Sequence, residues 1–99
     1  MSILSTERDV FAESVEFTDD SLTVRLDDGR SLSVPLTWYP RLLHGAKTER
    51  DNYRLIGAGE GIHWPDLDED ISVQGLLAGR NSAETDASLA RWLGNRGKS

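Results

Sequence analysis

The densest group of side chains that could carry chemistry is a short acidic run at residues 66–70. It comprises Asp66, Asp68, Glu69 and Asp70. Carboxylates at this density can bind a divalent cation or act as a general acid and base. A helix–loop–helix calcium site needs glycine and glutamate at its sixth and twelfth positions, where a loop starting at Asp66 has Ile71 and Leu77. The run therefore lacks the calcium-loop signature.

Three interpretations of the acidic run remain open. Carboxylates favour the positively polarised start of a helix, and Ser72 is a good N-cap for a helix directly after the run. The run could instead belong to a surface that binds a partner protein. It could also bind a metal ion in a metal-dependent enzyme.

The other reactive side chains do not form a recognisable catalytic set. His44 and His63 are nineteen positions apart, which is not a ligand-like spacing. The chain has no cysteine, and no serine lies in a Gly-x-Ser-x-Gly motif. The glycines at residues 57–61 lead into an extended segment that ends at Pro65, which indicates a hairpin turn and not a phosphate-binding loop. We therefore expect no catalytic residue, metal-ligand set or cofactor.

Three tryptophans are many for 99 residues. Trp38 and Trp64 lie where core contacts are expected, and each indole N–H needs an acceptor. Trp92 lies on a short terminal helix, where it could anchor the helix to its own domain or contact another chain. The acidic run, Trp64 and the terminal helix together give a candidate partner surface. It comprises Trp64, Asp66, Asp68, Glu69, Asp70, Leu89, Trp92 and Leu93.

Alternating apolar and polar residues predict three consecutive strands that precede these candidates. Residues 11–17, 22–26 and 32–36 each alternate with period two, and Phe11 is expected on the same face as Val15. The acidic pair at residues 19–20 and the Asp-Gly pair at residues 28–29 are turn signals. The segments together predict an antiparallel meander with one apolar and one polar face.

The rest of the chain predicts short helices around a second hairpin. Helical spacing indicates a covering helix at residues 40–46 and a further helical turn capped by Thr48. Residues 53–65 predict a β-hairpin, and residues 72–78 predict a helix that ends at Gly79. A last amphipathic helix at residues 86–93 is too short to be stable alone in water.

These elements predict an α+β fold with two-layer packing. It comprises a three-stranded antiparallel meander, a helix, a second β-hairpin and short C-terminal helices. We divide the chain into an N-terminal arm at residues 1–9, a single α+β domain at residues 10–79, and a polar linker with a short helix at residues 80–99. The length supports one core, and the absence of cysteine, of a leader-like start and of a membrane-length apolar run favours a cytoplasmic protein.

The charge is distributed unevenly. Residues 1–79 carry seven Lys or Arg against fifteen Asp or Glu, a net charge of −8, and residues 80–99 carry four against two, a net charge of +2. The acidic body should repel phosphate backbones, because nucleic-acid affinity rests on Lys and Arg. We expect no nucleic-acid partner except indirectly or through the basic tail, and no membrane partner.

Three segments resemble the domain of unknown function 2442 family of small bacterial proteins. They are residues 22–30, residues 34–42 and, most distinctively, residues 62–73, which read IHWPDLDEDISV. The resemblance implies no activity, catalytic residue or cofactor. Some members look like the smaller partner in two-gene toxin–antitoxin-type arrangements, and others carry a fused helix-turn-helix module. The chain after Gly79 is too short for that module.

We therefore expect a non-catalytic protein-binding or regulatory module, with the antitoxin-like partner of a two-gene system as one form of it. A basic partner protein would complement the acidic body, and a homodimer would also give the last helix a surface. One alternative is a metal-dependent enzyme that uses residues 66–70. The other is a DNA-associated regulator that uses the basic C-terminal tail.

Overall fold

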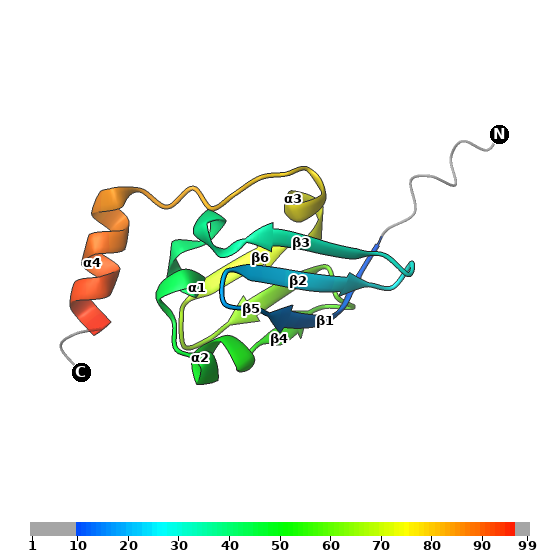
Figure 1. Ribbon diagram of the computed structural model, residues 1–99, viewed down its shortest axis with the longest axis horizontal. Coiled ribbons are helices and arrows are strands. Elements are labelled where there is room, and N and C mark those ends of the chain that lie inside the picture. The colour runs from blue at the N-terminus through cyan, green and yellow to red at the C-terminus, as the bar shows by residue number, and fades with distance from the viewer. Residues whose placement is uncertain (1–9, 97–99) are drawn as a thin grey trace.

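The computed structural model describes residues 10–96, so the expected N-terminal arm at residues 1–9 lies outside the described residues, as do residues 97–99. The described chain has two three-stranded antiparallel sheets and several short helices (Figure 1). The elements are β1 (Ala12–Phe17), β2 (Ser21–Leu26), β3 (Ser31–Pro35), the 3-10 helix η2 (Leu36–Trp38), α1 (Pro40–His44), α2 (Lys47–Asp51), β4 (Arg54–Ile56), β5 (Gly61–Trp64), β6 (Glu69–Ser72), α3 (Val73–Leu77) and α4 (Asp86–Arg96). The predicted α+β class is confirmed.

The first sheet is the predicted meander, with the strand order β1-β2-β3. On the central strand, Leu22 and Val24 are buried and Arg25 is exposed, as the period of a strand requires. The register of β1 shifts at a β-bulge between Ala12 and Ser14. The bulge turns Ala12 toward the core, so the expectation that Phe11 and Val15 share the buried face is wrong.

The second sheet contains one strand more than the predicted hairpin. Strands β4 and β5 form that hairpin, and the glycine turn is confirmed by positive φ angles of 61° at Gly57 and 111° at Gly59. Strand β6 then pairs antiparallel with β5, from Trp64 opposite Glu69 to Gly61 opposite Ser72. The acidic run is therefore half turn and half strand, and it does not directly precede a helix.

Strand β1 is joined to the second sheet at two points. The Ala12 N–H donates to the Gly59 carbonyl at 2.7 Å, and the Val15 N–H donates to the Tyr53 hydroxyl at 3.1 Å. A Cβ on Gly59 would lie 2.4 Å from the Ala12 carbonyl oxygen, so only glycine permits this approach.

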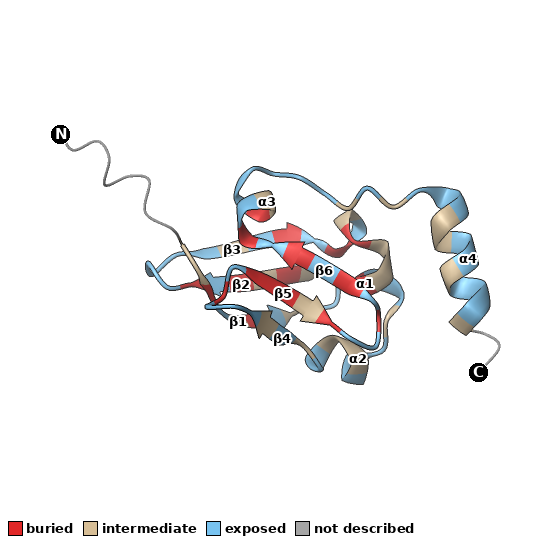
Figure 2. Cartoon of the chain, turned by 180° about the vertical axis from the view of Figure 1, so that it is seen from behind, coloured by how far each residue is buried: buried red, intermediate tan, exposed pale blue. Residues whose placement is uncertain are grey.

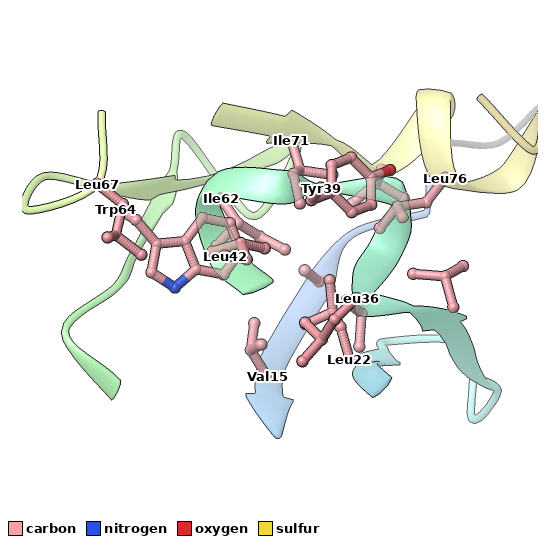
Figure 3. Close-up of a cluster of buried hydrophobic side chains, with 14 of the residues drawn as sticks. Val15, Leu22, Leu36, Tyr39, Leu42, Ile62, Trp64, Leu67, Ile71 and Leu76 are labelled. Atoms are coloured by element: carbon pink, nitrogen blue, oxygen red, sulfur yellow. The ribbon is translucent and has the colours of Figure 1, made fainter. Parts of the chain in front are cut away.

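The apolar faces of the two sheets meet in one core (Figure 3), so the second sheet, together with the predicted covering helix α1, forms the layer over the first sheet. The segment between the sheets adds Leu36, Tyr39 and Leu42 to that core. Trp64 is fully buried, its Nε1–H donates to the Arg50 carbonyl at 2.9 Å, and its ring packs edge-on against Phe17. Burial of this apolar area is the main stabilisation of so small a domain.

The short helices follow the sequence expectations with one exception. Helix α1 begins at Pro40 and is followed by Gly45, and the Ser72 hydroxyl caps α3 by accepting from the Gly75 N–H at 2.9 Å. The expectation that Thr48 caps the next helix is wrong. Helix α2 starts at Lys47, because the Glu49 carboxylate accepts from the Ala46 N–H at 2.8 Å and fixes the start there.

Helix α4 lies at one end of the molecule, beyond a long linker that starts after α3 (Figure 1). Gly79, with φ of 75°, ends the preceding helix in the left-handed conformation, as predicted. None of the α4 residues is buried (Figure 2). Among the described helices, none is long and apolar enough to span a bilayer.

Candidate partner surface

Arg41 of α1 connects the acidic turn to the C-terminal linker. Its Nε donates to Glu84 Oε1 at 2.6 Å and its Nη2 to Glu84 Oε2 at 3.2 Å. Its Nη1 donates to the Asp68 carbonyl at 3.0 Å and lies 3.4 Å from the Asp68 carboxylate. Arg41 is largely buried, and this pairing lowers the pKa of Glu84 below its usual value. One guanidinium therefore fixes two segments that are far apart in the sequence.

Helix α4 is attached to the domain by Trp92 and Arg96. The Arg41 guanidinium lies 5.3 Å from the centre of the Trp92 ring, and the Arg96 guanidinium lies 4.7 Å from it. Arg96 also makes two bonds, of 2.7 and 3.1 Å, to the Glu49 carboxylate on α2. These bonds lower the pKa of Glu49. The helix thus contacts its own domain through charged and aromatic groups.

The structure brings the two halves of the predicted surface together. Asp68 of the acidic turn and Trp92 of α4 both contact Arg41. Leu89 and Trp92 are half-buried, and Leu93 keeps 37% of its area exposed. Asp68 and Trp92 therefore both lie against one guanidinium. We call the six members of the predicted set that are not buried the α4–turn surface. It comprises Asp66, Asp68, Asp70, Leu89, Trp92 and Leu93.

Two residues of the predicted set do not belong to this surface. Trp64 has no exposed area, because it closes the core between the sheets. Glu69 keeps only 9% of its area exposed, because alternation along β6 turns it inward while Asp70 turns outward. Their inclusion in an exposed partner surface is wrong.

The three exposed carboxylates of the acidic run point to different partners. Asp66 accepts from the Asn52 amide at 2.9 Å, Asp68 faces Arg41, and Asp70 lies 2.5 Å from Nδ1 of His63 on the neighbouring strand. No group of three His, Asp or Glu side chains in residues 10–96 is arranged to bind a metal ion. The geometry therefore does not favour the metal-dependent alternative.

Glu69 lines a cavity of about 280 Å³ between β6, Tyr39 and the linker. Burial raises the pKa of its carboxyl from 4.5 to about 7, against the opposing effect of Arg41. Glu84, Asp70 and Asp68 raise it further. Arg41, Glu49 and Glu84, which position the α4–turn surface, were not singled out from the sequence, because nothing in their local spacing marks them.

Residues 12–82 match the family described as protein of unknown function (DUF2442). The chain belongs to this family. The DUF2442 segment contains Arg41 and the acidic turn, whereas Glu84 and α4 lie beyond its matched end. No curated protein matches the chain.

Two solved structures share the fold. A protein of unknown function from Rhodospirillum rubrum ATCC 11170 is 26% identical and has a TM-score of 0.66, with 81% of this chain and 96% of that chain covered. An uncharacterized protein from Chromobacterium violaceum is 21% identical and has a TM-score of 0.65, with 90% of this chain and 81% of that chain covered. Neither likeness supplies an activity for the DUF2442 chain.

Proposed function

We propose that this DUF2442 chain is a non-catalytic protein-binding module whose α4–turn surface binds a partner protein with a basic face. The observation that carries the proposal is the placement of α4. An 11-residue helix is not stable alone in water, yet α4 has no buried residue on its own domain. A partner that covers Leu89, Trp92 and Leu93 would supply the missing apolar burial.

The contacts that attach α4 to its own domain are weak enough to leave it available. Partly exposed ion pairs such as Arg96–Glu49 typically contribute about 0.2–1 kcal/mol, and cation–π contacts at accessible sites contribute about 0.5–1 kcal/mol. These contacts orient the helix and leave Leu89 and Trp92 only half-buried, with Trp92 packed against the core, while Leu93 stays exposed. The arrangement presents Trp92, a residue type common in binding hot spots, beside exposed leucine.

The charge of the surface favours a basic partner. Asp66, Asp68 and Asp70 are exposed, and they belong to a body whose residues 1–79 carry a net charge of −8. A positive face on the partner would accelerate association and orient it. The two-gene arrangement implied by the family resemblance makes the product of an adjacent gene the first partner to test, with this chain in the antitoxin-like role.

The DNA-associated alternative has less support. Arg96, one of the basic residues of the tail, is paired with Glu49, so a phosphate contact would have to displace that carboxylate. Lys98 lies outside the described residues. The alternative of a homodimer shares the same surface and is distinguished by the oligomeric state of the chain on its own.

The test compares two exposed leucines by isothermal titration with the adjacent gene product. Leu93 is 37% exposed on α4, and Leu77 is 38% exposed on α3, outside the proposed surface. We expect Leu93→Asp to weaken binding at least about tenfold, because it places a charge in the apolar contact, and Leu77→Asp to leave the Kd unchanged.

A second comparison tests the charge. The double variant Asp66→Asn/Asp70→Asn should bind the adjacent gene product more weakly and with less dependence on salt. The double variant Glu13→Gln/Asp19→Asn removes the same charge elsewhere and should change neither the affinity nor its salt dependence. Absence of binding by the wild-type chain, or equal affinities of the Leu93→Asp and Leu77→Asp variants, contradicts the proposal.

A further inference from the structure

The cavity beside β6 contains a buried carboxyl without a hydrogen-bond partner. Its volume is about 280 Å³, and it lies between residues 69–72 of β6, Tyr39 and linker residues 80–83. Glu69 is 91% buried by area, and no described residue donates a hydrogen bond to its carboxyl. Buried polar groups are nearly always paired, because a missing partner costs about 1–3 kcal/mol. A donor from outside the chain would remove that cost.

Of the donor groups near Glu69, the Arg41 guanidinium and the Tyr39 hydroxyl are already committed to other acceptors. The Arg41 guanidinium lowers the pKa of Glu69 through its charge, but its N–H groups donate to Glu84 and to Asp68. The Tyr39 hydroxyl donates to the Arg80 carbonyl at 3.0 Å. The Arg80, Asn81 and Ser72 side chains also line the cavity, but none of them donates a hydrogen bond to the Glu69 carboxyl.

The surroundings of Glu69 favour a cationic donor over a neutral one. Asp70 also lines the cavity, and Asp68 and Glu84 act on Glu69 from the turn and the linker. Together with Glu69, these carboxyl groups outnumber the guanidinium groups of Arg41 and Arg80, so the cavity attracts a positive ligand and repels an anion. Ser72 and Asn81 line the cavity as well and offer neutral oxygen acceptors.

We propose that this cavity binds a protonated primary amine or a guanidinium group, with the Glu69 carboxylate as its counter-ion. The volume is that of about nine water molecules, which suits the end of a lysine or arginine side chain. The group comes either from a basic side chain of the partner protein or from a free alkylamine. In the first case the inference rests on the proposed function.

The first experiment titrates the full chain with n-butylammonium and follows the backbone amides by NMR. We expect saturable shifts at residues 69–72 and 80–83. Tetramethylammonium, which has the same charge but no N–H donor, should give no saturable shift. Glu69→Gln should weaken n-butylammonium binding at least tenfold, and Glu60→Gln, which changes an exposed carboxylate, should not.

The same titration at two pH values needs no variant. Burial raises the pKa of Glu69 to about 7; Glu84, Asp70 and Asp68 also raise it, and Arg41 lowers it. Arg80 lines the same cavity. The Glu69 carboxyl is therefore protonated at pH 5.5. Binding of n-butylammonium should therefore be at least about tenfold weaker at pH 5.5 than at pH 8. Equal affinities at the two pH values, or equal shifts with tetramethylammonium, would overturn the inference.

A third arm separates the two sources of the cation. If the group belongs to the partner, Glu69→Gln also weakens binding of the adjacent gene product. If that affinity is unchanged while n-butylammonium binding is lost, the ligand is a free amine. If Leu93→Asp and Leu77→Asp bind the adjacent gene product with equal affinity, the proposed function is contradicted. If n-butylammonium still binds the cavity in that case, the present inference is retained.

Discussion

At the scale of single residues, Glu69 couples the stability of the domain to pH. Its carboxyl has a folded-state pKa of about 7, raised from 4.5 mainly by burial. Between these two values the unfolded chain releases the proton while the folded chain retains it. Folding stability therefore falls as pH rises through this window, because the folded state binds more protons. Below pH 4.5 both states are protonated, and above pH 7 the loss is complete.

We predict that Glu69→Gln removes this pH dependence. The wild-type chain should lose up to about 3 kcal/mol of unfolding free energy between pH 5 and pH 8, relative to the variant, from a shift of this size. Urea denaturation at both pH values, followed by tryptophan fluorescence, measures the difference. A difference between the two proteins that does not change with pH would show that Glu69 ionises normally in the folded state.

At the scale of elements, the attachment of α4 depends on a few side chains. Glu49 on α2 binds Arg96, and Arg41 on α1 contacts both Trp92 and Glu84. No sheet residue takes part in these side-chain pairs, and Trp92 is the α4 residue that packs against the core. Helix α4 should therefore open without unfolding the sheets.

We predict that Glu49→Gln loosens α4 and leaves the sheets unchanged. Glutamine can still accept from the Ala46 N–H and start α2, but it lacks the charge that binds Arg96. Amide hydrogen exchange in residues 86–96 should become about two- to fivefold faster, as expected for the loss of up to about 1 kcal/mol. Exchange in β2 and β5 should not change.

The control is Glu16→Gln, which breaks the exposed pair with Arg25 on the first sheet. It removes the same charge without touching α4. Faster exchange of α4 in this control, or unchanged exchange in Glu49→Gln, would mean that the Arg96 pair does not attach the helix.

Local patterns predicted most elements, and the exceptions have physical reasons. Period-two alternation located β2 and β3, and the Ser72 cap and Gly79 located α3. Strand β6 was missed because its acidic residues suggested a helix start, although Glu69 and Ile71 alternate inward with Asp70 and Ser72 outward.

The candidate surface was predicted in part. The exposed acids and the α4 residues were named from their types and spacing. Their meeting at Arg41 depends on how the linker crosses the domain, which is a tertiary contact between residues 41 and 84. The inward orientation of Glu69 likewise depends on the pairing of β6 with β5, which no local signal fixed.

At the scale of the whole molecule, the two sheets are a scaffold with the α4–turn surface at one end. The polar face of the first sheet carries a paired Thr23 and Ser33 and a paired Arg25 and Glu16, and these side chains satisfy one another. Side chains that pair with one another on this face leave fewer free donors and acceptors for a ligand. On α4, the exposed Leu93 and the half-buried Leu89 and Trp92 offer apolar area to a partner.

The central claim is tested most directly by mapping the contact on the isotope-labelled full chain by NMR, with the adjacent gene product as the ligand. We predict that amide signals of residues 66–70 and 86–96 shift or broaden on binding, and that those of β2 and β3 do not. Perturbation centred on the polar face of the first sheet, with α4 unaffected, would contradict the proposal that the α4–turn surface binds the partner.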